Sequence, residues 1–125
     1  NAMRGIHHRE PGIAGFGLMN KEIYIEVIAD PFHLDTKIID LIFSVKNPER
    51  IIIVSDTVNA SEVTPVAHGI RNKENKLLGG SVTIKESAER LIQMRPDKKE
   101  IVLKAISENP ERYLKTKGLA LSDYP

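Results

Sequence analysis

Apolar residues gather into two short runs along the chain, with an amphipathic stretch between them. The first run, 23–29, is rich in β-branched residues and predicts a strand. The second, 51–54, is apolar without alternation, which is typical of a strand buried on both faces in a parallel sheet. Between them, Asp35 predicts the N-cap of a helix and Asn47-Pro48 its end, so the order predicts a right-handed βαβ unit. The apolar face of that helix comprises Ile38, Ile39, Leu41, Ile42 and Val45.

The segments that flank this unit carry turn signals and helix caps. Prolines and glycines predict a loop over 4–20, and they predict an extended loop over 57–80 with at most one short strand. The rest of the chain predicts three capped helices. Their signals are Thr83 with Glu86 as a capping box, Arg95-Pro96 as a stop, Asp97 with Glu100 and then Asn109-Pro110 as starts, and Gly118 as the last stop.

Composition narrows the class of protein. The chain has 125 residues, which predicts one domain over 1–125, and a net charge of +1 from 18 Lys and Arg against 17 Asp and Glu. The two signs are interspersed, so we expect neither nucleic acid nor a membrane as partner. The chain has no cysteine, which excludes disulfides and thiolate chemistry and suits a cytoplasmic protein. Asn1 and Ala2 stand before Met3, either as native residues or as the remnant of a cleaved tag.

Several polar residues lie where an α/β protein keeps its chemistry. Asp56 follows the buried run directly, where a carboxylate serves as general base or metal ligand, or simply forms a turn. His33 follows the other strand and would either donate a hydrogen bond to a substrate hydroxyl or carbonyl, or pack structurally. Arg9 lies among prolines and glycines, as a phosphate or carboxylate ligand or as a solvated side chain.

Other candidates are weaker. Gly79-Gly80-Ser81 before a helix offers free amides to an anion or a sugar hydroxyl, but it is also an ordinary turn. His7 and His8 are adjacent and indicate loop residues rather than a metal site, and His68 indicates a surface position. The sequence contains no phosphate-binding Gly-rich loop and no His-Glu-x-x-His zinc helix.

Taken in order, the loop motifs resemble a known family. They are Asn1-Ala2-Met3, Arg9-Glu10-Pro11-Gly12, Ala29-Asp30-Pro31-Phe32-His33, Ser55-Asp56 and Leu78-Gly79-Gly80-Ser81. In this order they resemble the N-acetylglucosamine-6-phosphate deacetylases, with Pro31 in place of the family's glycine. The resemblance implies an α/β fold, the C-terminal portion of a (β/α)8 barrel that is incomplete in this chain. In the family, zinc or iron activates the water that attacks the acetamide.

The resemblance also implies roles for individual residues. Asp56 would be the catalytic base, His33 would bind the sugar, and Arg9 would bind the phosphate with the amides of Asn1 and Ala2. The backbone of Leu78, Gly79 and Gly80 would line the pocket. The family's metal ligands, a glutamate and two histidines, precede the Asn-Ala-Met motif and are absent from this chain, so we expect it to bind no metal alone.

Two further expectations concern partners and alternatives. We expect a small sugar phosphate as ligand, and either a homo-oligomer or a separate N-terminal half as protein partner. An open sheet edge and apolar strand faces favour such association. Two other readings stay open: a barrel deacetylase for another N-acyl substrate, or a non-catalytic remnant that only folds and oligomerises.

Overall fold

The predicted βαβ unit forms the centre of the molecule. The computed structural model describes residues 1, 3–57, 65–66, 69–72, 74 and 76–119. Strands β1 (Ile25–Ile28) and β2 (Ile51–Val54) pair in parallel, with Ile25 opposite Ile51 and Ile28 opposite Val54. Helix α2 (Thr36–Val45) connects them, so the prediction of parallel strands is confirmed.

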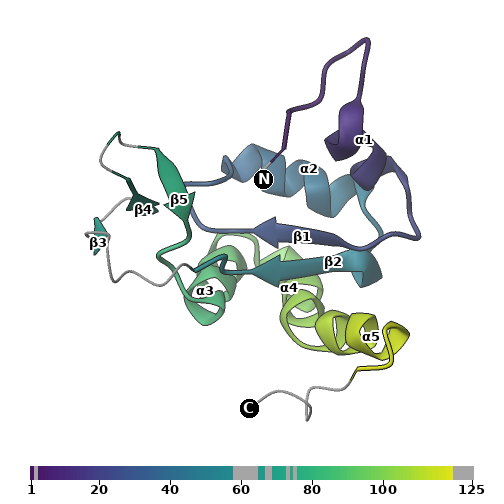
Figure 1. Cartoon of the computed structure of the whole chain (residues 1–125). Coiled ribbons are helices and arrows are strands. Elements are labelled where there is room, and N and C mark those ends of the chain that lie inside the picture. Colours follow the sequence, from purple (N-terminus) through teal and green to yellow (C-terminus); the bar gives the residue numbers. More distant parts are fainter. Residues whose placement is uncertain (2, 58–64, 67–68, 73, 75, 120–125) are drawn as a thin grey trace.

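Helices cover both faces of this strand pair (Figure 1). Helix α2 lies on one face, and α3 (Ile84–Met94), α4 (Lys99–Ile106) and α5 (Glu108–Thr116) lie on the other. Burial on two faces explains why the 51–54 run does not alternate, because Ile51, Ile52 and Ile53 are all buried. The core cluster comprises Val27, Ala29, Ile39, Ile42, Phe43, Ile51, Ile53, Ala88, Leu91, Val102 and Ala105.

Most of the predicted helix ends are confirmed. The Asp35 side chain accepts a hydrogen bond from the Lys37 amide at the start of α2. Thr83 and Glu86 form the reciprocal capping box of α3. Gly118 has a φ of +70°, the left-handed conformation that commonly ends a helix.

Two predicted caps are wrong. Asp97 belongs to the 3-10 turn η2 (Pro96–Lys98) and pairs with the Arg95 guanidinium instead of capping α4. Asn109 lies inside the first turn of α5, fully buried, and its amide nitrogen donates to the carbonyls of Pro48 and Ile51 at 2.8 Å each. In both cases a tertiary or ion-pair partner outcompetes the helix's own amides.

The predicted loop over 4–20 is wrong in its second half, where helix α1 (Gly12–Met19) forms. Two of its glycines, Gly15 and Gly17, permit close packing rather than turns. A Cβ on Gly15 would stand 2.5 Å from the Pro11 Cβ, and a Cβ on Gly17 would stand 3.4 Å from Ile25. The glycine content therefore reflects tight contacts, which composition alone does not separate from turn chemistry.

The predicted loop over 57–80 contains more strand than expected. Strands β3 (Pro65–Val66), β4 (Gly69–Arg71) and β5 (Leu77–Gly79) form a small antiparallel sheet beside the strand pair. Strands of two or three residues are too short to show alternation. His68 lies outside the described residues. Among the described residues, we find no helix with the length and apolar character that a membrane crossing requires.

Candidate functional site

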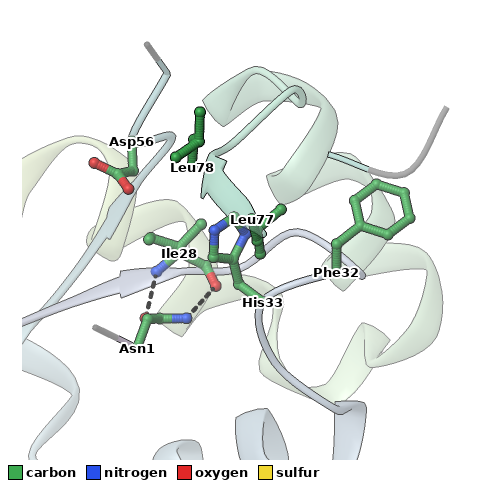
Figure 2. A pocket seen from close by; sticks show the side chains of 7 residues that line it. All are labelled: Asn1, Ile28, Phe32, His33, Asp56, Leu77 and Leu78. Atoms are coloured by element: carbon green, nitrogen blue, oxygen red, sulfur yellow. Dashed lines mark hydrogen bonds between the residues drawn. The ribbon is translucent and has the colours of Figure 1, made fainter. Parts of the chain in front are cut away.

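The carboxyl ends of β1 and β2 open onto a single pocket. Because the two strands are parallel, the residues that follow them meet at the same edge of the sheet. The pocket has a volume of about 280 Å³, near the lower end for small-molecule sites. It is lined by Asn1, Ile28, Phe32, His33, Asp56, Leu77 and Leu78 (Figure 2).

Asp56 occupies this edge in an unusual backbone conformation. Its φ is +50°, in the left-handed region that costs a non-glycine residue free energy. The Asp56 carbonyl accepts a hydrogen bond from the Gly80 amide at 2.9 Å, which helps to hold that conformation. Within the described residues, no hydrogen bond or ion pair engages its exposed carboxylate. The side chain is therefore available to a ligand, as a general base would be.

His33 lies against a buried carboxylate. Its Nδ1 is 2.8 Å from Oδ2 of Asp30, a residue with 1% of its surface exposed. The other oxygen of Asp30 accepts the backbone N–H groups of Phe32 and His33 at 2.8 and 2.9 Å. Asp30 thus holds both the turn after β1 and the ring of His33. The sequence predicted no role for Asp30, which only forms part of a motif there. An aspartate three residues before a histidine was a signal that could have indicated this pair.

Asn1 completes the edge of β1. Its carboxamide nitrogen donates to the Ile28 carbonyl at 3.1 Å, and its oxygen accepts from the Ile28 amide at 2.9 Å (Figure 2). The side chain pairs with β1 as the peptide group of a neighbouring strand would. Its predicted neighbour Ala2 lies outside the described residues.

The glycine turn packs against the segment that carries Asp56. Leu78 lines the pocket, whereas Gly79 and Gly80 do not. A Cβ on Gly80 would stand 1.9 Å from the Ser55 carbonyl oxygen, so this position requires glycine. Gly80 also bridges to Thr57, which joins the turn to the segment that carries Asp56. The expected contact of both glycines with a ligand stays a prediction.

Arg9 is not brought to the pocket. It lies exposed in the turn between His7 and Glu10, and its backbone N–H donates to His7 Nδ1 at 3.3 Å. The rings of His7 and His8 contact each other at a tilt of 35°, with centroids 4.3 Å apart. The structure therefore joins His33 with Asp56, and leaves Arg9 apart from them.

The side chains of the described residues do not suit a metal ion. Among the residues the structure describes, no group of three or more His, Cys, Asp or Glu side chains could hold a metal. The residues described here therefore do not form a metal site by themselves.

The curated relatives of this chain are deacetylases of N-acetylated sugar phosphates. No family model matches the chain. It is 34% identical over 82 residues to the N-acetylgalactosamine-6-phosphate deacetylase of Escherichia coli O157:H7, covering 66% of this chain and 22% of the relative. It is 32% identical over 85 residues to the N-acetylglucosamine-6-phosphate deacetylase of Bacillus subtilis, covering 68% of this chain and 20% of the relative.

A solved structure shows the same fold over almost the whole chain. The crystal structure of N-acetyl-D-glucosamine-6-phosphate deacetylase from Mycobacterium smegmatis superposes with a TM-score of 0.80 at 26% identity. The match covers 95% of this chain and 35% of that one. The chain spans less than half the length of the curated relatives that it matches.

Proposed function

Because this chain is related to the N-acetylglucosamine-6-phosphate deacetylases and matches only part of each, we propose that it supplies one side of such an active site. The proposed whole is a (β/α)8 barrel whose C-terminal portion is this chain, acting on N-acetylglucosamine 6-phosphate. The observation that carries the proposal is the pocket at the carboxyl ends of β1 and β2, where His33 and Asp56 line one cavity.

In the proposed reaction Asp56 moves the protons. Its carboxylate accepts a proton from the water whose oxygen attacks the acetamide carbonyl carbon. As the tetrahedral intermediate collapses and the C–N bond breaks, Asp56 returns that proton to the amine nitrogen. The products are acetate and the free amino sugar phosphate. The Asp56 carboxylate is exposed and has no partner among the described residues, which supports this role because a general base must be free to accept a proton.

The other residues bind the sugar phosphate. His33 would contact the sugar from the wall of the pocket, and Leu78 would cover it. Arg9 would bind the phosphate together with the backbone amides of Asn1 and Ala2, which requires its turn to lie closer to the pocket than it does here. Gly79 and Gly80 would contribute backbone groups to the pocket.

We place the ligands of the divalent metal, zinc or iron, on polypeptide outside this chain, so no step above is assigned to a metal. The isolated chain is then expected to release no acetate. Zinc-dependent acetate release by the purified chain would overturn this part of the proposal.

We further propose that the isolated chain associates, with a second copy or with a separate N-terminal half. Helix α1 leaves large apolar side chains in solvent, with Ile13 74%, Phe16 57% and Met19 67% exposed. Apolar patches of this kind are uncommon on monomers. Light scattering should give a mass above the 14.0 kDa of one chain, and a clean monomer would contradict the proposal.

One experiment tests the catalytic role. A chimera carries this chain in place of the matching segment of the Bacillus subtilis relative, and acetate release from N-acetylglucosamine 6-phosphate is measured with and without Asp56→Asn. We expect Asp56→Asn to lower kcat by about 10²–10⁴-fold, the usual contribution of a general base. Asp35→Asn is the matched control, because asparagine also caps helices and Asp35 lies at the start of α2. A chimera indifferent to Asp56→Asn would refute the role.

A second candidate substrate is N-acetylgalactosamine 6-phosphate. It is favoured by the 34% identity to the Escherichia coli O157:H7 relative, which carries that substrate in its name. Comparing kcat/KM of the same chimera for the two sugar phosphates separates the candidates. Activity on neither sugar phosphate would instead favour another N-acyl substrate or a non-catalytic remnant.

A further inference from the structure

The pair formed by Asp30 and His33 carries more information than a binding contact. Asp30 is 1% exposed, and its carboxylate meets three nitrogens of the turn after β1. Oδ1 accepts two backbone N–H groups, and Oδ2 faces the ring nitrogen Nδ1 of His33 at 2.8 Å. An ionised carboxylate accepts hydrogen bonds and donates none, so the proton of this contact belongs to Nδ1.

We propose that Asp30 is a positioning residue that holds His33 as the Nδ1–H tautomer. The neutral ring then presents Nε2 as a hydrogen-bond acceptor, and no hydrogen bond engages Nε2 within the part of the chain that the structure describes. The ligand group at His33 must therefore bring the proton, as the hydroxyl of a sugar can. This reverses the sequence-based expectation that His33 donates, and its bearing on the ligand rests on the proposed deacetylase function.

Three features make Asp30 suited to this role. The ring of His33 has only 11% of its side-chain surface exposed, so it cannot turn away from Asp30 without leaving its packing. Asp30 sits close behind Gly80, where an added Cβ would lie 3.5 Å from Oδ2, so water has little access to the carboxylate. The Arg90 guanidinium donates to the carbonyl of Ala29 at 2.8 Å, which holds the end of β1 just before Asp30.

Asp30→Asn should invert the tautomer. Asparagine has one oxygen, and the two backbone N–H groups of Phe32 and His33 require it. Its NH₂ group must then face Nδ1 and donate to it, which forces the ring proton onto Nε2. The turn itself keeps its acceptor, so the substitution changes the ring more than the fold. A merely structural role for Asp30 would not move the proton.

Nitrogen-15 NMR of the labelled chain measures this directly, because two-bond proton couplings distinguish the ring nitrogen that carries the proton. Spectra are taken at a pH where the ring is neutral, and His33→Gln identifies the resonances among the four histidines. We expect Nδ1–H in the wild type and Nε2–H in Asp30→Asn. Asp35→Asn, which makes the same charge change at the α2 cap, should keep the wild-type pattern.

Two outcomes overturn the inference: an Nε2–H tautomer in the wild type, or an unchanged tautomer in a folded Asp30→Asn variant. The wild-type spectrum alone decides the first, even if the variant fails to fold. Titrating N-acetylglucosamine 6-phosphate into the same samples tests the ligand. We expect its binding to shift Nε2 in the wild type and to weaken about tenfold in Asp30→Asn. An Nδ1–H ring that no sugar phosphate perturbs would count against the proposed function and leave the positioning role standing.

Discussion

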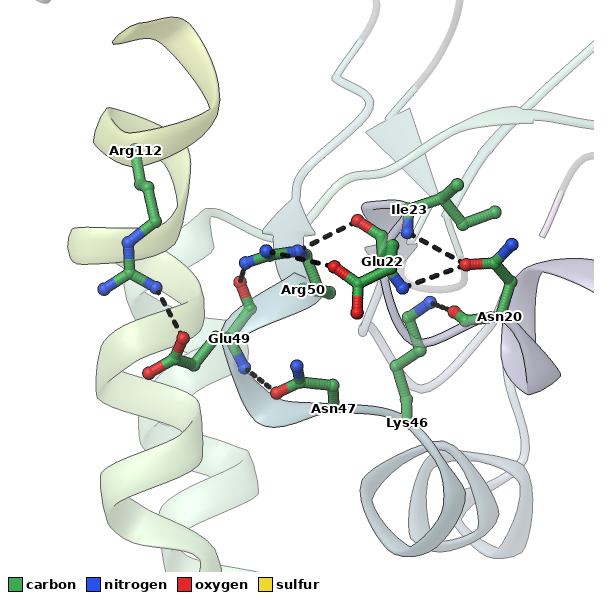
Figure 3. Close-up of polar contacts among 8 residues, drawn as sticks. All are labelled: Asn20, Glu22, Ile23, Lys46, Asn47, Glu49, Arg50 and Arg112. Atoms are coloured by element: carbon green, nitrogen blue, oxygen red, sulfur yellow. Dashed lines mark hydrogen bonds and ion pairs between the residues drawn. The ribbon is translucent and has the colours of Figure 1, made fainter. Parts of the chain in front are cut away.

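The two ends of the parallel strand pair use their polar residues differently. At the amino-terminal end, side chains are tied to backbone groups and to each other (Figure 3). The Lys46 ammonium donates to the carbonyls of Gly17 and Asn20, and Arg50 Nε donates to the Glu22 carbonyl at 2.9 Å. At the carboxyl end, the Asp56 carboxylate has no partner within the described residues, and the backbone of Asp56 is strained.

This difference separates stability from chemistry. Hydrogen bonds at the amino-terminal end join α1, α2, β2 and α5, so losing them should loosen the fold. The carboxyl end leaves a carboxylate and an imidazole nitrogen available to a ligand, and accepts some strain in doing so. In barrel enzymes, residues at the carboxyl ends of strands serve catalysis and those at the opposite ends serve stability. The predictions below test whether that division holds here.

The largest stability effect is expected at Asn109. Asn109→Ala leaves the buried carbonyls of Pro48 and Ile51 without their donor, which should lower the free energy of unfolding by about 2–3 kcal/mol. The Asn109 oxygen is buried without a partner within the described residues, which limits the loss. Urea unfolding measures it, with Asp56→Asn as control from the other end of the strands. Equal losses from the two variants would contradict the division.

A smaller loss is expected at Lys46. Lys46→Met removes the donor that holds the carboxyl-terminal end of α1, which should lower the free energy of unfolding by about 1–2 kcal/mol. Amide hydrogen exchange should then rise first in α1, because the Lys46 contacts with Gly17 and Asn20 tie that helix to α2. Lys37→Met, at an exposed position of α2, is the matched control. Uniform exchange throughout the chain would argue against a local role for Lys46.

At the carboxyl ends of the strands, a substitution should raise the stability of the fold instead of lowering it. Asp56→Gly removes the cost of a left-handed φ of +50° and should stabilise the fold by about 0.5–1 kcal/mol. Thermal unfolding measures this as a raised Tm. The same substitution should abolish acetate release by the chimera, since it removes the proposed base. A lowered Tm would mean that the Asp56 side chain contributes to stability.

The smallest expected effect is a pH dependence that Lys46 produces. Burial, followed by the charge of Arg50, lowers the pKa of Lys46 in the folded state, while Glu22 opposes the shift. The unfolded chain therefore binds more protons between the folded pKa and the ordinary lysine pKa of 10.5, so stability rises with pH across that window. Below the window the penalty is fully present. Lys46→Met should flatten this rise in urea unfolding, and Lys37→Met should retain it.

Much of the fold was predictable because its signals are local. The unalternating run 51–54, the N-cap Asp35 and the Thr83–Glu86 box each depend on residues a few positions apart. Their structures form as predicted, since helix caps and buried strands are decided by short-range sterics and hydrogen bonds. The strand-end rule likewise brought His33 and Asp56 to one pocket.

Other features were decided by contacts between distant parts of the chain. Gly80 must be glycine because a Cβ there would lie 1.9 Å from the Ser55 carbonyl oxygen. Asn109 serves the carbonyls of Pro48 and Ile51 rather than its own helix. The role of Asp30 is visible only in the tertiary structure, where its buried carboxylate contacts the ring of His33. Glycine and asparagine have the same local preferences in turns and in tight contacts, so only the neighbours that the tertiary structure supplies can tell these uses apart.

The sequence by itself determined the parallel strand pair, the helix α2 that connects its strands and the residues at its carboxyl edge. The tertiary structure decided which other residues meet His33 and Asp56. It grouped Asn1, His33, Asp56 and Leu78 around one cavity and left Arg9 in an exposed turn. The physical reason is that hydrophobic periodicity and helix capping act within a few residues, whereas the position of a loop depends on what the remainder of the fold packs against it.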